Sequence, residues 1–269
     1  FYKLSVSNAG FFMSIGSIGY VLSIVAFRKK FDIYPPKKII ITSDHGNYSA
    51  ERSIDVKKFF TNIGMSFMDD YYVDFGAVGF FYFKGNDWND LTAKDLMNYG
   101  EKKLDLLKFV LDLPGVKYIA YKGEKTSKNE NTIMVQGKKG VGKITQDGEL
   151  TKYEFDGEDP LEYDLDENSR TLIDGNFHSI DVWLEHTFGT ENIIVVDQLS
   201  RILTLDNSAD IIAVTDGKTV YHHLHSHDLP TPECMRVPIL IHHPNIKRKD
   251  LGLLKITEIH DIILNYLRS

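Results

Sequence analysis

A short run of β-branched apolar residues sets the first limit on the fold. The run KIIIT at residues 38–42 follows two prolines and leads directly into Asp44 and His45. A short apolar run bounded by turn residues is typical of a buried strand. Apolar residues at helical spacing precede it within residues 11–30. A helix followed directly by a strand indicates an α/β chain.

The remaining pattern predicts further helices and strands along the chain. Residues 122–153 alternate short β-prone runs with Gly, Lys, Asn and Asp, which is typical of β-hairpins. The acidic stretch 154–169 is expected to be a solvated turn. Helices are predicted at 54–62, 92–111, 192–205 and 255–267, and strands at 73–83, 116–121, 209–215 and 235–242.

Residues 11–27 (FFMSIGSIGYVLSIVAF) form the only membrane-like stretch of the sequence. The stretch is shorter than the roughly 20 apolar residues that a spanning helix needs, and serines interrupt it. Ile15, Ile18, Leu22 and Val25 recur at helical spacing. This pattern favours a core-facing helix over a membrane span.

Charge and cysteine content exclude some classes of function. The net charge of −7 argues against binding to a nucleic-acid backbone, which requires a basic surface. The single cysteine, Cys234, excludes an internal disulfide and a zinc site built from several cysteines. One cysteine is compatible with a reducing compartment such as the cytoplasm. Nothing in the sequence around Cys234 marks it as a nucleophile.

Asp44 and His45 are the first candidate site residues. They follow an expected strand, and in open α/β sheets ligands bind beyond the carboxyl ends of strands. A carboxylate oxygen and an imidazole nitrogen suit zinc or manganese better than calcium. The alternative is that Asp44 caps the following turn and His45 is a surface residue.

A second candidate region, residues 221–244, is rich in histidine. The region lies between two expected strands, so its side chains could reach the same sheet edge as Asp44. The alternative is a polar loop whose histidines are hydrogen-bonded or solvated. Six of the ten histidines in the chain fall here: His222, His223, His225, His227, His242 and His243.

Residues 137–144 (GKKGVGKI) have the glycine and lysine spacing of a phosphate-binding loop. Such a loop requires Ser or Thr after its lysine, and a strand before and a helix after it. Here Ile144 follows Lys143, and the flanking sequence predicts hairpins. The segment is therefore not expected to bind phosphate in that way.

Several segments together resemble the alkaline phosphatase superfamily, in particular its type I phosphodiesterase/nucleotide pyrophosphatase-like branch. IIITSDHG resembles the strand-plus-Asp-His-Gly motif of that superfamily. HSHDLPTPECMRVPIL resembles a late segment in which a histidine precedes Val-Pro by about ten residues, and this spacing selects His227. DGEDPLEY resembles a Gly-Asp-Pro-Leu turn of prokaryotic members, and LLKITEIHDIILNYL resembles their closing helix.

The resemblance implies both a fold and an activity. The expected fold is an alkaline-phosphatase-like sheet flanked by helices in residues 1–64 and 166–269, with an inserted α+β cap subdomain in residues 65–165. The implied activity is metal-dependent hydrolysis of a small-molecule phosphate ester with two divalent ions, usually zinc, with manganese as the alternative. Asp44 and His45 would bind one ion and His227 the other.

The sequence also departs from the family pattern. No Asp-x-x-x-His sequence and no identifiable nucleophile precede Asp44, and Asp228 stands where glycine usually follows the late histidine. The chain is therefore expected to correspond to the C-terminal portion of such an enzyme. Two alternatives remain: an inactive member that serves as a binding or structural module, and a phosphoglycerate mutase-like enzyme, which Asn47 after Gly46 keeps open.

Overall fold

A computed structural model describes residues 39–88, 91–124, 130–163, 172–173, 175–242 and 252–268. The chain divides into two units, one formed by residues 1–44 with 237–269 and the other by residues 45–236. The boundaries expected from the sequence, at 64/65 and 165/166, do not coincide with this division. The helix expected at 11–30 lies outside the described residues.

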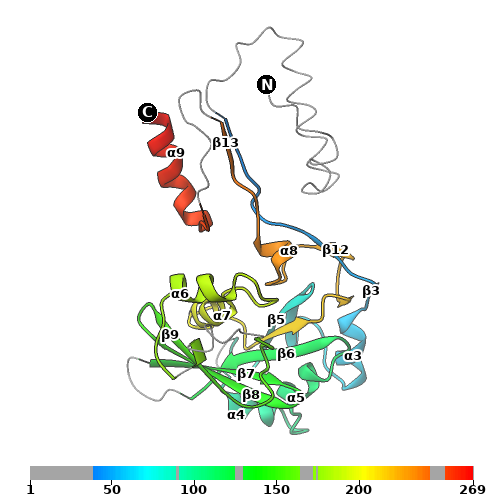
Figure 1. The fold of residues 1–269 in the computed structure, drawn as a ribbon. Helices are drawn as coiled ribbons and strands as arrows, with labels where there is room; N and C mark the ends of the chain where they lie inside the picture. Colours follow the sequence, from blue (N-terminus) through cyan, green and yellow to red (C-terminus); the bar gives the residue numbers. More distant parts are fainter. Residues whose placement is uncertain are drawn as a thin grey trace, which may run out of the picture. The chain divides into compact units, whose positions relative to one another are not determined.

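The larger unit is built on one seven-stranded antiparallel sheet with the order β4-β5-β10-β6-β7-β8-β9 (Figure 1). The protein is thus a mixed α/β protein. Within the sheet, neighbours in sequence are mostly neighbours in space, and β10 is the exception. The strands are β4 (Tyr71–Phe75), β5 (Val78–Phe83), β6 (Val116–Lys122), β7 (Glu130–Gly137), β8 (Gly140–Asp147), β9 (Leu150–Gly157) and β10 (Ile211–Thr215).

Strand β10 lies in the interior of this sheet, between β5 and β6. It pairs with β5 on one side and with β6 on the other, and all five of its residues are buried. Ile211 and Ala213 face one core, whereas Ile212 and Val214 face the other. Apolar packing on both faces explains why this strand is a continuous apolar run rather than an alternating one.

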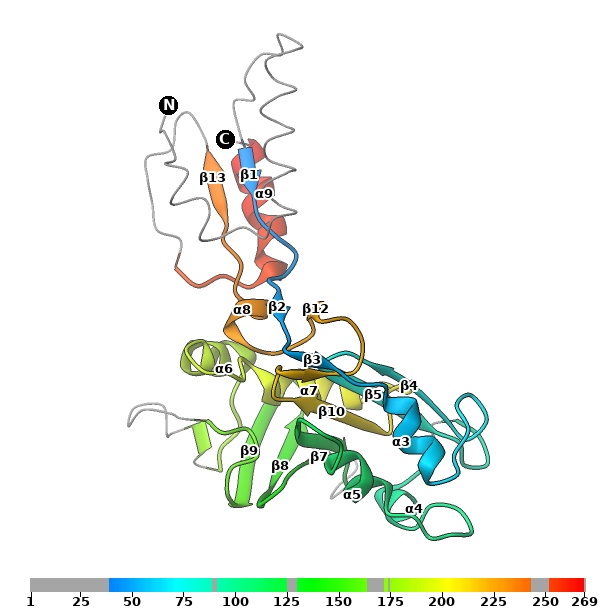
Figure 2. The ribbon, with the colours of Figure 1, turned by 90° about the vertical axis from the view of Figure 1, so that its right-hand side faces the viewer.

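Helices cover both faces of the sheet, and each face has its own core (Figure 1, Figure 2). Phe60 of α3 and Leu107 of α5 belong to one core, and Trp183 of α6 and Leu199 of α7 belong to the other. The helices are α3 (Val56–Asn62), α4 (Ala93–Met97) and α5 (Leu106–Leu111) on the first face, and α6 (Ile180–Thr187) and α7 (Val195–Leu203) on the second.

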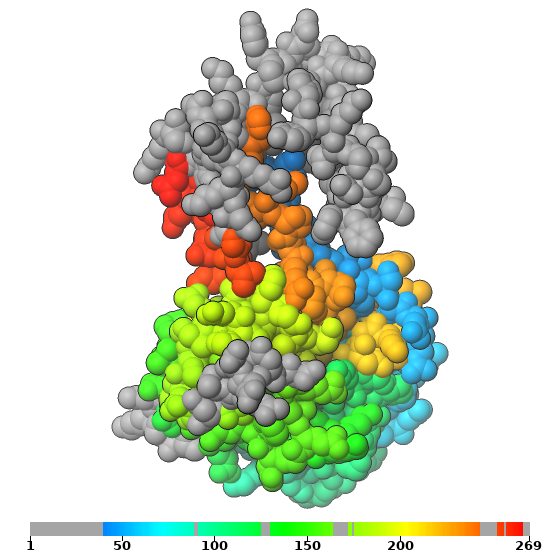
Figure 3. Space-filling model, in the orientation of Figure 1, coloured from blue at the N-terminus to red at the C-terminus, as the bar shows by residue number. Residues whose placement is uncertain are grey.

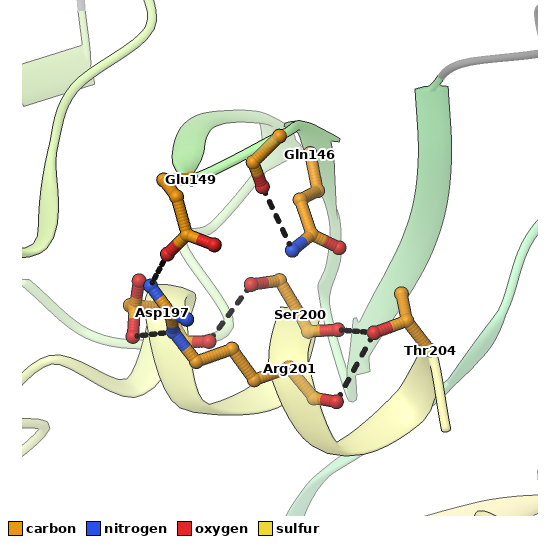
Figure 4. A network of polar contacts seen from close by, with 7 residues as sticks. Gln146, Glu149, Asp197, Ser200, Arg201 and Thr204 are labelled. Carbon is orange, nitrogen blue, oxygen red and sulfur yellow. Dashed lines mark hydrogen bonds and ion pairs between the residues drawn. The ribbon is translucent and has the colours of Figure 1, made fainter.

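Polar contacts attach α7 to the hairpin of β8 and β9 (Figure 4). Nε of Arg201 donates to the buried Asp197 carboxylate at 2.7 Å, and its Nη2 donates to Glu149 in the hairpin turn at 2.8 Å. The guanidinium therefore neutralises a carboxylate that would be costly to bury alone. In the space-filling view, yellow-green atoms, the colour of the part of the chain that includes α6, form a continuous patch (Figure 3).

Two predicted elements are each divided in the structure. The strand predicted at 73–83 is a hairpin of β4 and β5 that turns at Gly76-Ala77. The helix predicted at 92–111 is two short helices, because Asp105 caps a new helix and Gly100 adopts a φ of 64°. Helical periodicity continues across this break, so it does not reveal the break. Helix α6 was not predicted.

Most other predicted elements are confirmed. They include α3, β6, the hairpins of β7–β9, α7 and β10, together with β1 (Ile39–Ile41), η2 (Ile256–Glu258) and α9 (Ile259–Arg268). The strand predicted at 235–242 is shorter, because α8 (Pro232–Met235) precedes β13 (Leu240–His242). The expected acidic turn begins later than predicted, since β9 continues to Gly157.

In the smaller unit, β1 and β13 pair in antiparallel register, with Ile40 opposite Ile241 (Figure 2). The 3₁₀ turn η2 leads into α9, whose apolar residues recur at helical spacing as the sequence predicts. Among the described residues, no helix combines the length and apolar character that crossing a membrane requires.

Replacement of the buried Tyr118 is expected to reduce the alkaline sensitivity of the fold. Burial raises the pKa of Tyr118 above its ordinary value of about 10, so the folded state retains a proton that the unfolded state releases. This contribution is fully present below about pH 10 and is lost as pH rises above it. Between pH 10 and 12, Tyr118→Phe should lessen the fall in unfolding free energy by about 1.4 kcal/mol per pH unit.

The measurement is urea unfolding at a series of pH values, with the exposed Tyr72→Phe as the matched control. Tyr118→Phe also loses the hydrogen bond to Asn192, and that loss lowers stability equally below pH 10. An unchanged slope above pH 10 would contradict the prediction.

Candidate functional site

The first and the last segment of the larger unit, residues 45–54 and residues 219–236, lie side by side. Ala50 N–H donates to the Leu224 carbonyl at 2.6 Å, and Ile54 N–H donates to the Val220 carbonyl at 2.9 Å. These contacts surround two small sheets: β2 (Tyr48–Ser49) with β12 (His225–Ser226), and β3 (Arg52–Ser53) with β11 (Thr219–Val220). The two regions singled out from the sequence are therefore held together by backbone pairing.

Gly46 lies against the backbone of α8. Its N–H donates to the Cys234 carbonyl at 2.8 Å, and Asn47 N–H donates to the Glu233 carbonyl at 3.1 Å. A Cβ atom at position 46 would lie 1.6 Å from the Glu233 carbonyl oxygen, which no side chain can do without moving the backbone. The glycine after His45 thus has a structural cause, which is close approach of two main chains.

The rings of His45 and His227 stack against each other. Their centroids are 3.8 Å apart, and the ring planes differ by 19°. His45 is half-buried and His227 is exposed. Nδ1 of His45 lies 2.7 Å from the Gly46 carbonyl oxygen, which can only accept, so Nδ1 carries the proton. In the neutral ring the lone pair is then on Nε2.

Asp44, the third predicted ligand, belongs to the smaller unit. Its side chain is exposed, and Oδ1 accepts a hydrogen bond from Ser43 Oγ at 3.2 Å. Within the described parts of the chain, no group of three or more His, Cys, Asp or Glu side chains lies close enough together to bind a metal ion. Within the larger unit, the structure brings together the predicted ligands His45 and His227.

The other histidines of the cluster lie in different surroundings. His222 and His223 make an edge-to-face ring contact at 3.9 Å, and Nδ1 of His225 lies 2.8 Å from Ser49 Oγ. His242 is exposed in β13, and His243 lies outside the described residues. Only His227 within this described group is in ring contact with His45.

Asp228, which follows His227, connects three parts of the larger unit. Oδ1 accepts a hydrogen bond from the Tyr48 hydroxyl at 2.8 Å. Oδ2 accepts from the backbone N–H groups of Ala77 and Val78, each at 2.9 Å. Burial raises the pKa of Tyr48, and the hydrogen bond to Asp228 raises it further, so the phenol keeps its proton.

From the sequence, Asp228 stands out only as the residue after His227, and nothing in the sequence singles out Tyr48. The hydrogen bonds between Asp228 and its donors at Tyr48, Ala77 and Val78 could not be found from spacing, because these residues lie far from Asp228 in the sequence. Burial also raises the pKa of the Cys234 thiol, which agrees with the absence of nucleophile features around it.

A cavity of about 460 Å³ lies elsewhere in the larger unit, and no histidine lines it. Its wall includes the turn between β7 and β8, where the phosphate-loop-like residues 137–144 form a hairpin rather than a loop leading into a helix. Lys117 pairs with Glu162 at 2.6 Å, and Lys139 pairs with Glu158 at 3.1 Å. These ion pairs offset much of the positive charge of Lys117 and Lys139. The hairpin at residues 137–144 excludes the phosphate-loop interpretation, as the sequence predicts.

Comparisons with known proteins return no match. No protein-family model, no curated protein and no solved structure is similar to the chain by the criteria applied.

Substitution of Gly46 should strongly destabilise the larger unit. The added methyl group of Gly46→Ala would overlap the Glu233 carbonyl, so the pairing of residues 45–47 with α8 must open. Overpacking of this kind costs about 1–3 kcal/mol. Gly189→Ala is the matched control because a Cβ there meets open space. Chemical unfolding of both variants checks this, and equal stabilities would contradict the close approach.

Proposed function

We propose that the protein is a metal-dependent phosphoesterase of the alkaline-phosphatase-like type, acting on a small-molecule phosphate ester. The observation that carries the proposal is the ring contact between His45 and His227. These histidines belong to the two segments whose sequences resemble the metal-binding motifs of that superfamily. The Asp-His-Gly motif selected His45 and the spacing to Val-Pro selected His227, and backbone pairing brings their segments to one place.

The state of the His45 ring supports a role as ligand. Metal-binding histidines commonly donate their second ring N–H to a backbone carbonyl or a carboxylate, which fixes the tautomer and the ring orientation. Nδ1 of His45 makes such a contact with the Gly46 carbonyl, and Nε2 then carries the lone pair. An imidazole nitrogen is a good ligand for zinc and for manganese.

The spacing of the two rings is compatible with two ions. Nearly parallel rings 3.8 Å apart can direct their lone pairs at two neighbouring positions about that far apart. Metal ions in two-metal phosphoesterase sites lie about 3.5–4 Å from each other. One ion on His45 and the other on His227 is the assignment that the sequence resemblance implies.

The proposal needs ligands beyond these two rings. Asp44 is retained as a ligand because of the sequence resemblance, since it precedes His45 in the Asp-His-Gly motif. No residue is assigned as nucleophile. When bound, the metal ions would hold a phosphoryl oxygen and stabilise the charge that develops on it.

Purified protein is expected to bind zinc, with manganese as the weaker alternative. His45→Ala and His227→Ala should each weaken zinc binding by more than the roughly 10–100-fold that loss of an outer-shell partner causes. Titration calorimetry with a competing chelator measures the affinity, and elemental analysis gives the metal content.

His223→Ala is the matched control, because His223 lies in the same exposed loop and contacts His222 instead of His45. A wild-type protein without zinc or manganese would contradict the proposal. So would an unchanged metal content in His227→Ala.

Turnover should distinguish the phosphoesterase from the other functions that the sequence leaves open. When joined to the upstream region that would supply a nucleophile, the metal-loaded protein is expected to hydrolyse a nitrophenyl phosphodiester and to leave phosphoglycerate unchanged. Release of nitrophenolate and isomerisation of phosphoglycerate are the two assays. Conversion of phosphoglycerate would favour the mutase, and metal binding without either reaction would favour a binding or structural module.

A further inference from the structure

The Asp228 carboxylate holds both histidine-bearing segments in place. His227 is its immediate neighbour in the chain, and the Tyr48 hydroxyl that donates to Oδ1 comes from the short segment that begins with His45. A carboxylate that accepts three hydrogen bonds has little freedom to rotate. Its position therefore limits where both histidine rings can lie.

The turn that donates to Oδ2 of Asp228 is itself held in place by backbone hydrogen bonds. Ala77 and Val78, whose N–H groups donate to Oδ2, form the turn and the first residue of β5. Thr215 N–H donates to the Ala77 carbonyl at 2.9 Å, and Tyr221 N–H donates to the Gly76 carbonyl at 3.0 Å. The turn is thus fixed to the end of β10, an interior strand of the sheet that is paired on both sides.

We propose that Asp228 is a positioning residue that fixes His227 against His45 by anchoring both segments to the turn between β4 and β5. The role of Asp228 in positioning the rings follows from these hydrogen bonds alone. The effect of that role on metal binding rests on the proposed function. In the superfamily that the sequence resembles, glycine usually follows the late histidine. The same contacts explain why this chain has Asp228 at that position.

Gly76 provides an independent way to disturb this anchor. A Cβ atom at position 76 would lie 2.4 Å from Oδ2 of Asp228, so Gly76→Ala must displace the carboxylate while leaving Asp228 in the sequence. Asn at position 228, in contrast, is expected to keep the hydrogen bonds that Asp228 makes. Its carbonyl oxygen can accept from the two backbone N–H groups, and its NH₂ group can donate to the Tyr48 oxygen.

The first test observes the ring pair directly in the full chain with isotope-labelled histidine. Wild type should give a nuclear Overhauser contact between ring protons of His45 and His227, assigned with His45→Gln and His227→Gln. Asp228→Ala and Gly76→Ala should lose this contact, and Asp228→Asn should restore it. The exposed Asp156→Ala is the matched control and should keep the contact.

The second test measures zinc affinity by calorimetry with the same variants. Asp228→Ala and Gly76→Ala should weaken zinc binding about 10–100-fold, as is usual when a residue that orients a ligand is removed. Asp228→Asn should bind zinc nearly as tightly as wild type. Circular dichroism identifies any variant that fails to fold. If Asp228→Ala fails to fold, the comparison of Gly76→Ala with Asp228→Asn decides whether the carboxylate positions the rings.

The outcomes separate this inference from the proposed function. Loss of the ring contact in Asp228→Ala and its return in Asp228→Asn support the positioning role, even if wild type binds no zinc and the proposed function fails. A ring contact that persists in both Asp228→Ala and Gly76→Ala overturns the positioning role, even if wild type binds zinc tightly.

Discussion

Backbone hydrogen bonds between residues 45–54 and 219–236 hold the two ends of the larger unit side by side. Loop closure over so long a segment costs conformational entropy, and the sheet between the two ends offsets that cost through its two cores. The histidine pair depends on this closure, because each ring lies on one of the paired segments. A change that opens the pairing would separate the rings without touching either histidine.

Main-chain contacts bring the segments together, and side-chain contacts then set the rings. Gly46 permits the close approach to α8, and Asp228 receives donors from Tyr48 and from the turn before β5. The hydrogen bond from Nδ1 of His45 to the Gly46 carbonyl fixes the tautomer of that ring. Except for the Tyr48–Asp228 hydrogen bond, each of these contacts uses a backbone group, so the local geometry is determined more by the chain path than by the histidines themselves.

The elements with a clear periodicity could be predicted from the sequence, and β1, α3, β6 and α7 are examples. The breaks at Gly76 and Gly100 could not, because helical or β-prone patterns continue across them. The spacing of His227 to Val-Pro pointed to that residue through the family resemblance, and its role as a ligand stays a prediction. The role of Asp228 was not accessible, since periodicity is local and carries no information about donors in a distant turn.

The position of β10 has a consequence for how the chain folds. Residues 211–215 fill the gap between β5 and β6, which precede them by a long stretch of sequence. During synthesis, β4–β5 and β6–β9 can form first, and each then presents an unpaired strand edge until β10 arrives. Exposed edges of this kind are prone to intermolecular pairing. We therefore expect a late, non-local strand insertion in the folding of the larger unit, with nascent chains that end before residue 211 at risk of aggregation.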